Sequence, residues 1–146
     1  MKRPVGLFSN WWWAVILFAV DRVLKRLAYN ELISDQGGFF YLTLKINTQA
    51  VFSWPVANGA IQLLGWAAVA VVIAAMVKGR ERWEPLTRFG GQLIIVGGVS
   101  NLLDRFYYGG VIDILAAFNN LYFNLADVYL LGGAALLIVS KRIRLI

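Results

Sequence analysis

Four long hydrophobic stretches, separated by shorter polar ones, dominate the pattern of the sequence. Each stretch falls within the roughly 17–25 residues that an α-helix needs to cross a bilayer. The pattern therefore predicts an all-α integral membrane protein with one domain over residues 1–146. The expected transmembrane helices are residues 7–29, 59–78, 86–105 and 124–140, and the longer connections are residues 30–58 and 106–123.

One segment of the first long connection follows a different period. Within residues 39–47, hydrophobic and polar side chains alternate strictly from Phe40 to Asn47. A period of two is typical of a half-buried strand, and a lone strand cannot cross lipid. We expect a small β-strand cradle on the extracytoplasmic surface, with Lys45 and Asn47 facing the functional site.

Basic residues set the expected orientation. The net charge is +6, but the basic residues stand mainly at the ends of hydrophobic stretches, which indicates membrane anchoring and argues against nucleic-acid binding. One side carries nine of them: Lys2, Arg3, Lys78, Arg80, Arg82, Arg88, Lys141, Arg142 and Arg144. The other side carries five: Arg22, Lys25, Arg26, Lys45 and Arg105. Because cytoplasmic loops hold the excess of Lys and Arg, both termini are expected in the cytoplasm.

The composition narrows the available chemistry. The chain has neither cysteine nor histidine, which excludes disulfides, Cys- and His-based triads and the usual zinc sites. Hydrolytic chemistry would rest on Asp, Glu, Lys, Ser or Tyr, and no metal or cofactor is expected. A Ser–Lys mechanism through Ser53 or Ser100 is disfavoured, because no lysine lies at helical spacing from either serine.

Acidic side chains gather at one level of the expected membrane. At about 1.5 Å per residue, Asp21, Asp104 and Asp127 each lie about 21–25 Å along their helices from the cytoplasmic ends. Asp113 follows in the outward connection and can reach the same level. Because a carboxylate in lipid costs roughly 2.5–3.5 kcal/mol, the retention of several predicts a function at the outer face.

The first expected helix carries charged residues near its outer end. Asp21 and Lys25 lie four residues apart, so they can pair on one helix face. Arg22 and Arg26 lie one position further round and have two interpretations: they belong to the site, or they anchor the helix by snorkelling to the interface. On the third helix, glycines at seven-residue spacing predict close packing against its neighbours.

Further polar residues flank the second long connection. Asn101 and Arg105 share one face of the third expected helix. Asn124 and Asp127 form an N-x-x-D pattern, so helix capping alone is one interpretation of Asp127. The other is a carboxylate pair with a nearby aspartate such as Asp113, in which one member holds a proton. Such a pair can activate water and protonate a leaving amine, although paired carboxylates in membranes also conduct protons or ions.

Together these blocks resemble the bacterial lipoprotein signal peptidases (signal peptidase II), which are aspartic proteases of the cytoplasmic membrane. The resemblance runs the length of the chain. It rests on D-R-V-L-K from Asp21, N-T-Q-A-V-F-S from Asn47, S-N-L-L-D-R from Ser100, G-G-V-I-D-I from Gly109 and F-N-L-A-D from Phe123. It implies that Asp113 and Asp127 are the catalytic aspartates. It also implies a set of site-lining residues: Asp21, Lys25, Asn47, Asn101, Asp104, Arg105 and Asn124.

The resemblance further implies an activity and a place. The substrate would be a prolipoprotein whose lipobox cysteine already carries diacylglycerol, and the enzyme would cut just before that cysteine. The chain would be a monomer in the bacterial inner membrane, with its site at the outer leaflet and with substrate and membrane lipid as its partners. Gln49, Val51, Ser100 and Ile114 depart from the family pattern, which has Gly, Ala, Gly and Phe there.

Two other functions fit parts of the pattern. A small proton-coupled transporter would use the same carboxylates as a relay, but it would also need polar groups through the inner half of the membrane, where the expected helices have few. A catalytically inactive homologue would bind lipoproteins without cutting them, and the departures at Gln49 and Ser100 keep this hypothesis open.

Overall fold

The computed structural model describes residues 11–30, 39–48, 58–79, 83–118 and 121–143. Within them the chain forms four helices and a small three-stranded sheet. The helices are α1 (Trp12–Tyr29), α2 (Asn58–Lys78), α3 (Pro85–Tyr108) and α4 (Leu125–Ile143). The strands are β1 (Phe40–Asn47), β2 (Val111–Ala117) and β3 (Leu121–Phe123). Helices therefore form at all four expected places, and residues 7–10 of the first expected helix lie outside the described ranges.

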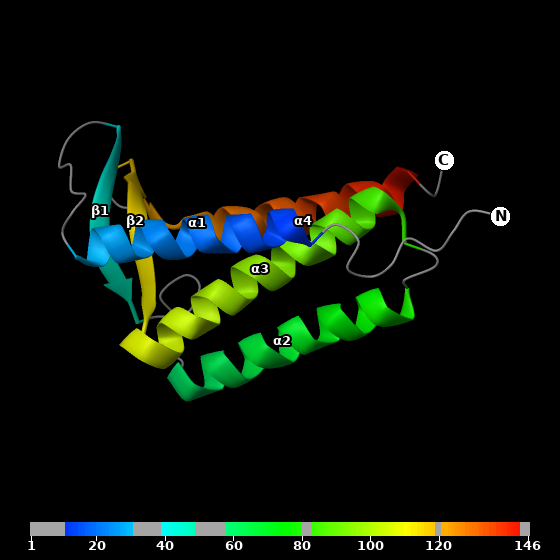
Figure 1. Cartoon of the computed structure of the whole chain (residues 1–146), viewed down its shortest axis with the longest axis horizontal. Helices are drawn as coiled ribbons and strands as arrows, with labels where there is room; N and C mark the ends of the chain where they lie inside the picture. Colours follow the sequence, from blue (N-terminus) through cyan, green and yellow to red (C-terminus); the bar gives the residue numbers. More distant parts are fainter. Residues whose placement is uncertain (1–10, 31–38, 49–57, 80–82, 119–120, 144–146) are drawn as a thin grey trace.

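The helices run lengthwise along the molecule, and the sheet lies across one end (Figure 1). Helix α3 is the centre of the bundle, because it contacts each of the other three helices and also β2. The last turns of α1 and α3 reach the sheet end, whereas α2 and α4 finish at the opposite end (Figure 1). The ends of α1 and α3 therefore lie against the sheet, and both helices contact β2.

Glycines allow α3 and α4 to pack closely. A Cβ atom added at Gly97 would lie 2.4 Å from the carbonyl oxygen of Ala126, and one added at Gly133 would lie 2.6 Å from that of Gly90. Such distances leave no space for a side chain, so the predicted close packing of the third helix is confirmed at these positions. This approach holds the start of α4 against the part of α3 that carries Asn101.

The sheet is antiparallel, in the order β1-β2-β3. The predicted strand in residues 39–47 is confirmed by β1. Its strict alternation is not, because the register with β2 shifts between Leu42, which faces Leu115, and Lys45, which faces Asp113. A β-bulge of this kind inserts an extra residue and re-aims the side chains that follow.

The connection expected over residues 106–123 contains two strands that the sequence did not indicate, β2 and β3. Helix α3 continues to Tyr108 and ends where Gly109 takes a left-handed φ of 73°, a conformation that glycine adopts without strain. The sequence V-I-D-I-L-A-A then forms β2, whose Ile112 and Ile114 pack with Ala28 of α1 in a hydrophobic cluster. This buried packing partner, which lies far away in the sequence, is what makes a strand of the segment.

Length and hydropathy alone do not distinguish all four helices as membrane spans. Within the described residues, only Gly59–Lys78 is long and apolar enough by both measures, and α4 contributes a shorter apolar run, Leu125–Ser140. Helices α1 and α3 carry charged side chains near the sheet end. The contacts of those side chains determine whether such helices can lie in lipid.

Candidate active site

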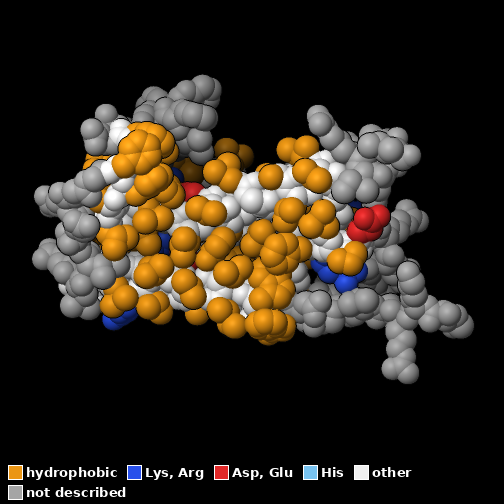
Figure 2. All heavy atoms as spheres, turned by 90° about the horizontal axis from the view of Figure 1, so that it is seen from above, with side chains coloured by type: hydrophobic (Ala, Val, Ile, Leu, Met, Phe, Trp, Pro, Cys, Tyr) orange, Lys and Arg blue, Asp and Glu red, His pale blue; other side chains and the backbone are white. Residues whose placement is uncertain are grey.

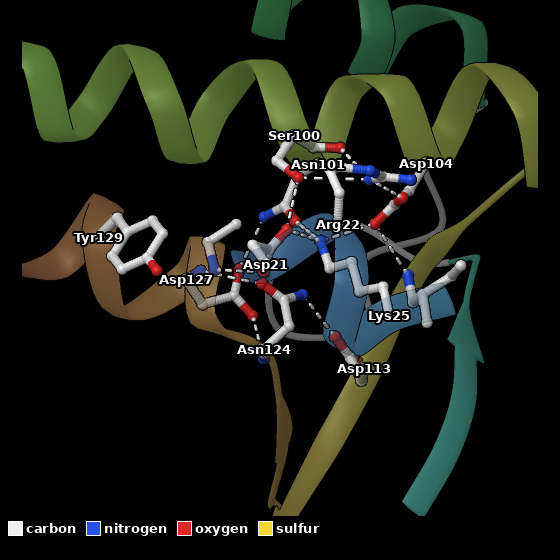
Figure 3. Close-up of polar contacts among 12 residues, drawn as sticks. Asp21, Arg22, Lys25, Ser100, Asn101, Asp104, Asp113, Asn124, Asp127 and Tyr129 are labelled. Atoms are coloured by element: carbon white, nitrogen blue, oxygen red, sulfur yellow. Dashed lines mark hydrogen bonds and ion pairs between the residues drawn. The ribbon is translucent and has the colours of Figure 1, made fainter. Parts of the chain in front are cut away.

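The site lies at the sheet end of the bundle, where α1, α3, β2 and the start of α4 meet (Figure 3). The structure brings together most of the residues that the sequence indicated. Among the residues in contact there are Asp21, Lys25, Asn47, Asn101, Asp104, Asp113, Asn124 and Asp127. In the described part of the chain, no buried side-chain nitrogen or oxygen lacks a hydrogen-bond partner.

Helix α4 begins with a capping box. The side-chain oxygen of Asn124 accepts a hydrogen bond from the backbone N–H of Asp127 at 3.0 Å, and Asp127 Oδ2 accepts one from the backbone N–H of Asn124 at 3.2 Å. The capping role proposed for Asp127 is thus confirmed. Its second oxygen, Oδ1, accepts a 2.8 Å hydrogen bond from Nδ2 of Asn101 on α3, so the same carboxylate also belongs to the polar cluster.

Asparagine 124 joins the two aspartates. While its oxygen caps Asp127, its Nδ2 donates to Asp113 Oδ1 at 3.0 Å. Figure 3 shows Asp113 and Asp127 on either side of this amide. Asn47 on β1 donates to the other oxygen of Asp113 at 3.3 Å. Asn124 therefore contacts two carboxylates from different elements, Asp113 through its side chain and Asp127 through its backbone N–H.

The environment of Asp113 favours its protonated form. Burial raises the pKa of the Asp113 carboxyl above its ordinary value, and the nearby charge of Asp127 raises it further. Hydrogen bonds from Asn124 and Asn47 and the charge of Lys25 oppose this rise without cancelling it. A buried carboxyl beside a second carboxylate is the arrangement in which one proton is shared by two acids.

A buried lysine connects α1 to α3. The Lys25 side chain is fully buried, and its Nζ lies 3.0 Å from Asp21 and 2.7 Å from Asp104. The predicted pairing of Asp21 with Lys25 is confirmed. Lys25 also donates to the side-chain oxygen of Asn101 at 3.1 Å. Because Asn101 also donates to Asp127, it bridges Lys25 and Asp127.

Both aspartates that pair with Lys25 make further contacts. Asp21 accepts hydrogen bonds from the hydroxyl of Ser100 and, at 3.1 Å, from the backbone N–H of Ala126 in α4. Asp104 pairs with Arg22 and accepts a 3.3 Å hydrogen bond from the backbone N–H of Ile112 in β2. These contacts fix α1 to the start of α4, and α3 to the first half of β2.

Sequence reasoning left two members of the site unassigned. Arg22 is held by Asp104 and by the backbone and hydroxyl oxygens of Ser100, so the interpretation of Arg22 as a snorkelling anchor is wrong. Ser100 was considered as a departure from glycine and as a disfavoured nucleophile, but not as a partner of Asp21. The position of Arg22 next to Asp21 in the sequence was the one indication that Arg22 belongs to the site. Its partner Asp104 could not be inferred, because it lies 82 residues away along the chain.

Two predicted residues lie at the edge of the cluster. Arg105 interacts electrostatically with Asp104, Asp113 and Asp127. Lys45 lies opposite Asp113 in the strand register, but its Nζ sits 3.6 Å from the centre of the Tyr122 ring. Asn47 faces the site as predicted, because it donates to Asp113. Lys45 instead makes a cation–π contact with Tyr122 on β3.

The site offers carboxyl chemistry. Its titratable acids are aspartates held by amide and cation donors, and Asn124 donates hydrogen bonds to two of them, Asp113 and Asp127. Across the described ranges, no three His, Cys, Asp or Glu side chains are grouped as a metal ion would require. One ionised and one protonated carboxyl can act as general base and general acid in a single step.

The chain matches a known family over most of its length. The family model described as signal peptidase (SPase) II matches residues 13–142. That stretch includes every residue of the site.

Curated relatives and solved structures agree with this match. A lipoprotein signal peptidase of Neisseria meningitidis serogroup C is 31% identical, over 97% of this chain and 94% of its own length. One from Synechocystis is 38% identical, over 96% of this chain and 94% of its own length. A bacterial membrane enzyme solved by the in meso method at 2.3 Å resolution has the same fold, with a TM-score of 0.72 and 21% identity. That comparison covers 88% of this chain and 84% of the solved one.

Proposed function

Because this chain belongs to the signal peptidase II family of lipoprotein signal peptidases, which are aspartic peptidases, we propose that it removes the signal peptide from diacylglyceryl-modified prolipoproteins. The bond cut is the peptide bond just before the lipidated cysteine. Asp113 and Asp127 are the catalytic residues. No metal or cofactor takes part in the reaction.

One observation carries this assignment: Asn124 binds both carboxyls, Asp113 through its side-chain NH₂ group and Asp127 through its backbone N–H. The two carboxyls are thereby tied to one residue, which supports their action on one substrate bond. The raised pKa of Asp113 supports a state in which the pair carries one proton. The cluster of Asp21, Lys25, Arg22 and Asp104 balances its own charge, so it supports the pair without adding net charge.

The reaction follows from a singly protonated pair. The ionised carboxylate takes a proton from water, and the water oxygen attacks the carbonyl carbon before the lipidated cysteine. The protonated partner donates a hydrogen bond to the oxygen that becomes negative. A proton then passes to the leaving cysteine nitrogen, the C–N bond breaks, and the pair returns with one proton. General acid–base catalysis of this kind typically contributes about 10²–10⁴-fold to the rate.

The surface of the bundle supports a position across the membrane. Figure 2 shows hydrophobic side chains over the middle of one face, with the charged side chains in view toward its two ends. Large apolar side chains point outward from several helices, including Val15, Leu63, Val71 and Leu131. Near the sheet, four charged side chains of α1 and α3 pair with one another: Asp21, Arg22, Lys25 and Asp104. Four spans, both termini in the bacterial cytoplasm and a monomeric enzyme complete the proposal.

The sheet end then lies at the outer leaflet. A lipidated substrate cannot leave the bilayer, so an enzyme for it must open at the level of the lipid headgroups. The carboxyl pair lies between α4 and the sheet, at the place where the hydrophobic bundle ends (Figures 1 and 3). This location suits a peptide bond next to a lipid anchor better than one in mid-membrane.

Cleavage of matched substrates tests the proposal. The purified protein in detergent is mixed with a prolipoprotein carrying diacylglycerol on its lipobox cysteine, and with the same precursor lacking the lipid. We expect release of the signal peptide from the lipidated form only, with a new N-terminal cysteine found by mass spectrometry. Binding of the lipidated precursor without cleavage would instead identify a catalytically inactive homologue.

A further inference from the structure

We propose that Lys25 is a positioning residue that acts through Asn101. By occupying the amide oxygen of Asn101, Lys25 commits the amide NH₂ group to Asp127, and this selects Asp127 as the ionised member of the pair and leaves the proton on Asp113. The inference rests on the proposed function, because it assigns the roles of general base and proton holder within that same pair.

The orientation of the Asn101 amide follows from its partners. The ammonium group of Lys25 can only donate hydrogen bonds. The atom of Asn101 that lies 3.1 Å from Lys25 Nζ must therefore be the oxygen, Oδ1. The NH₂ group is then the end of the amide that lies 2.8 Å from Asp127 Oδ1. Lys25 itself stays in place because it is fully buried between Asp21 and Asp104.

The other oxygen of Asp127 also faces a donor that cannot be reversed. Asp127 Oδ2 accepts from the backbone N–H of Asn124 at 3.2 Å, and a backbone N–H has no acceptor form. Asp127 lies in the first turn of α4, where the helix dipole favours negative charge. Fixed donors to both oxygens and a helix N-terminus all stabilise the ionised carboxylate.

The surroundings of Asp113 are less favourable to charge. Asp113 lies in a strand and not at a helix end, and its hydrogen bond from Asn47, at 3.3 Å, is the longest of those that hold the pair. Burial and the charge of Asp127 raise its pKa. When one proton is available for two carboxyls, these differences place it on Asp113.

The charged and titratable groups near Asp127 come from α1, α3, α4 and β2. Arg105 on α3 and Asp113 on β2 interact with it electrostatically. Lys25 on α1, with its partners Asp21 and Asp104, is connected to it through Asn101, and the phenol of Tyr129 on α4 interacts with Asp21. Lys25 is neutralised by Asp21 and Asp104, so its influence on Asp127 travels mainly through the Asn101 hydrogen bond. Removing the hydrogen bond from Asn101 to Asp127 is therefore the most specific way to change the ionisation of the pair.

The test is the pH dependence of kcat/KM for cleavage of a diacylglyceryl-modified lipobox peptide by the full-length enzyme. Asn101→Leu removes the donor to Asp127 while Lys25 keeps both of its aspartates. Since the base acts only when ionised, losing a donor keeps it protonated to higher pH. We expect the acidic limb of the profile to move up by about one pH unit, with the basic limb unchanged. Lys25→Met should move the same limb in the same direction.

Ser100→Ala is the matched control. Ser100 precedes Asn101 on α3 and binds Asp21, but the structure shows no hydrogen bond from it to Asp127 among the described residues. This variant should leave the acidic limb in place even if it lowers the rate. A uniform loss of rate in Asn101→Leu with unmoved limbs, or movement of the basic limb alone, would overturn the proposal.

The two proposals fail in different ways. Absence of cleavage by the parent enzyme at every pH would reject the proposed function. An infrared titration of the aspartic acid carboxyl bands needs no turnover, and it would still measure whether Asn101→Leu shifts ionisation in the pair. If Lys25→Met does not fold, the pH profile of Asn101→Leu alone tests whether the hydrogen bond from Asn101 keeps Asp127 ionised.

Discussion

Asp21 on α1 accepts a 3.1 Å hydrogen bond from the backbone N–H of Ala126 in the first turn of α4. The two residues are 105 positions apart in the sequence. The bond satisfies one of the N–H groups that every helix start leaves unpaired. It also fixes the turn of α4 that carries Asp127, so the first helix helps to place a proposed catalytic residue on the last one.

Replacement of Asp21 by asparagine should destabilise the fold. The variant removes one of the two carboxylates that pair with the buried Lys25. Breaking a buried ion pair typically costs about 3–5 kcal/mol, and we expect the low end because Asp104 remains. An unfolding titration in mixed micelles measures the loss. Arg26→Gln, at an exposed position on the same helix, is the control and should unfold as the parent does. Equal stability of the Asp21 variant and the parent would refute this.

Replacement of Asn47 by alanine should reduce turnover. The variant loses the 3.3 Å hydrogen bond to Asp113, and a hydrogen bond to a carboxyl is commonly worth about 1.5 kcal/mol, or roughly tenfold in kcat/KM. Leu44→Ile on the same strand is the control, because Leu44 is partly exposed and the exchange keeps the volume of the side chain. Equal sensitivity at both positions would mean that the strand serves only for packing.

The raised pKa of Asp113 predicts a pH-dependent cost in stability. Between the ordinary pKa of an aspartate, about 4, and its raised value in the fold, the folded state binds more proton than the unfolded state. The free energy of unfolding contributed by this group therefore falls as pH rises through that window. Asp113→Asn, which cannot ionise, should gain stability relative to the parent over the same interval. A constant difference across pH would contradict the raised pKa.

Cysteine labelling should reveal the orientation of the bundle. The natural chain has no cysteine, so single introduced thiols give an unambiguous signal. Tyr107→Cys, exposed at the sheet end of α3, should react with an impermeant reagent from outside intact cells or spheroplasts. Glu84→Cys, exposed just before α3, should react only after the membrane is opened. Labelling of the Tyr107 position from the cytoplasmic side alone would move the site to the other leaflet.

The hydrophobic pattern was sufficient to predict four helices and the strand β1, because each of these depends on local periodicity. It could not predict β2, whose seven residues become a strand by pairing with β1 and packing on Ala28. Contacts with distant partners decide such short segments. The end of α3 at Tyr108 likewise depends on Gly109, which ends the helix three residues beyond the expected boundary.

The site was predictable to the extent that spacing and motifs describe it. The pairing of Asp21 with Lys25 and the capping of α4 by Asn124 follow from separations of four and three residues. The contacts of Arg22 with Asp104 and of Ser100 with Asp21 join elements about 80 residues apart, and no local signal encodes them. Lys45 lies opposite Asp113 in the register, but its Nζ contacts the ring of Tyr122, and the alternation of the strand does not specify where so long a side chain ends.

The role of Asp104 should differ from that of the proposed pair. Asp104 binds Arg22, Lys25 and the backbone of Ile112. These contacts occupy both oxygens of its carboxylate, so we do not expect it to act on a substrate. We expect Asp104→Asn to lower the unfolding midpoint and to reduce the rate less than either change in the pair. Rates and unfolding midpoints measured on the same preparations separate the two effects.

The most direct test of the account is the initial rate of cleavage of a diacylglyceryl-modified prolipoprotein by Asp113→Asn and Asp127→Asn. Both exchanges keep the size of the side chain and end its proton transfer. We predict that each variant inserts and folds but cleaves at least about 10²-fold more slowly than the parent, and more slowly still if the pair acts as a unit. Near-normal cleavage by either variant, with loss of cleavage in Asp104→Asn or Asp21→Asn instead, would contradict the assignment of Asp113 and Asp127 as the catalytic pair.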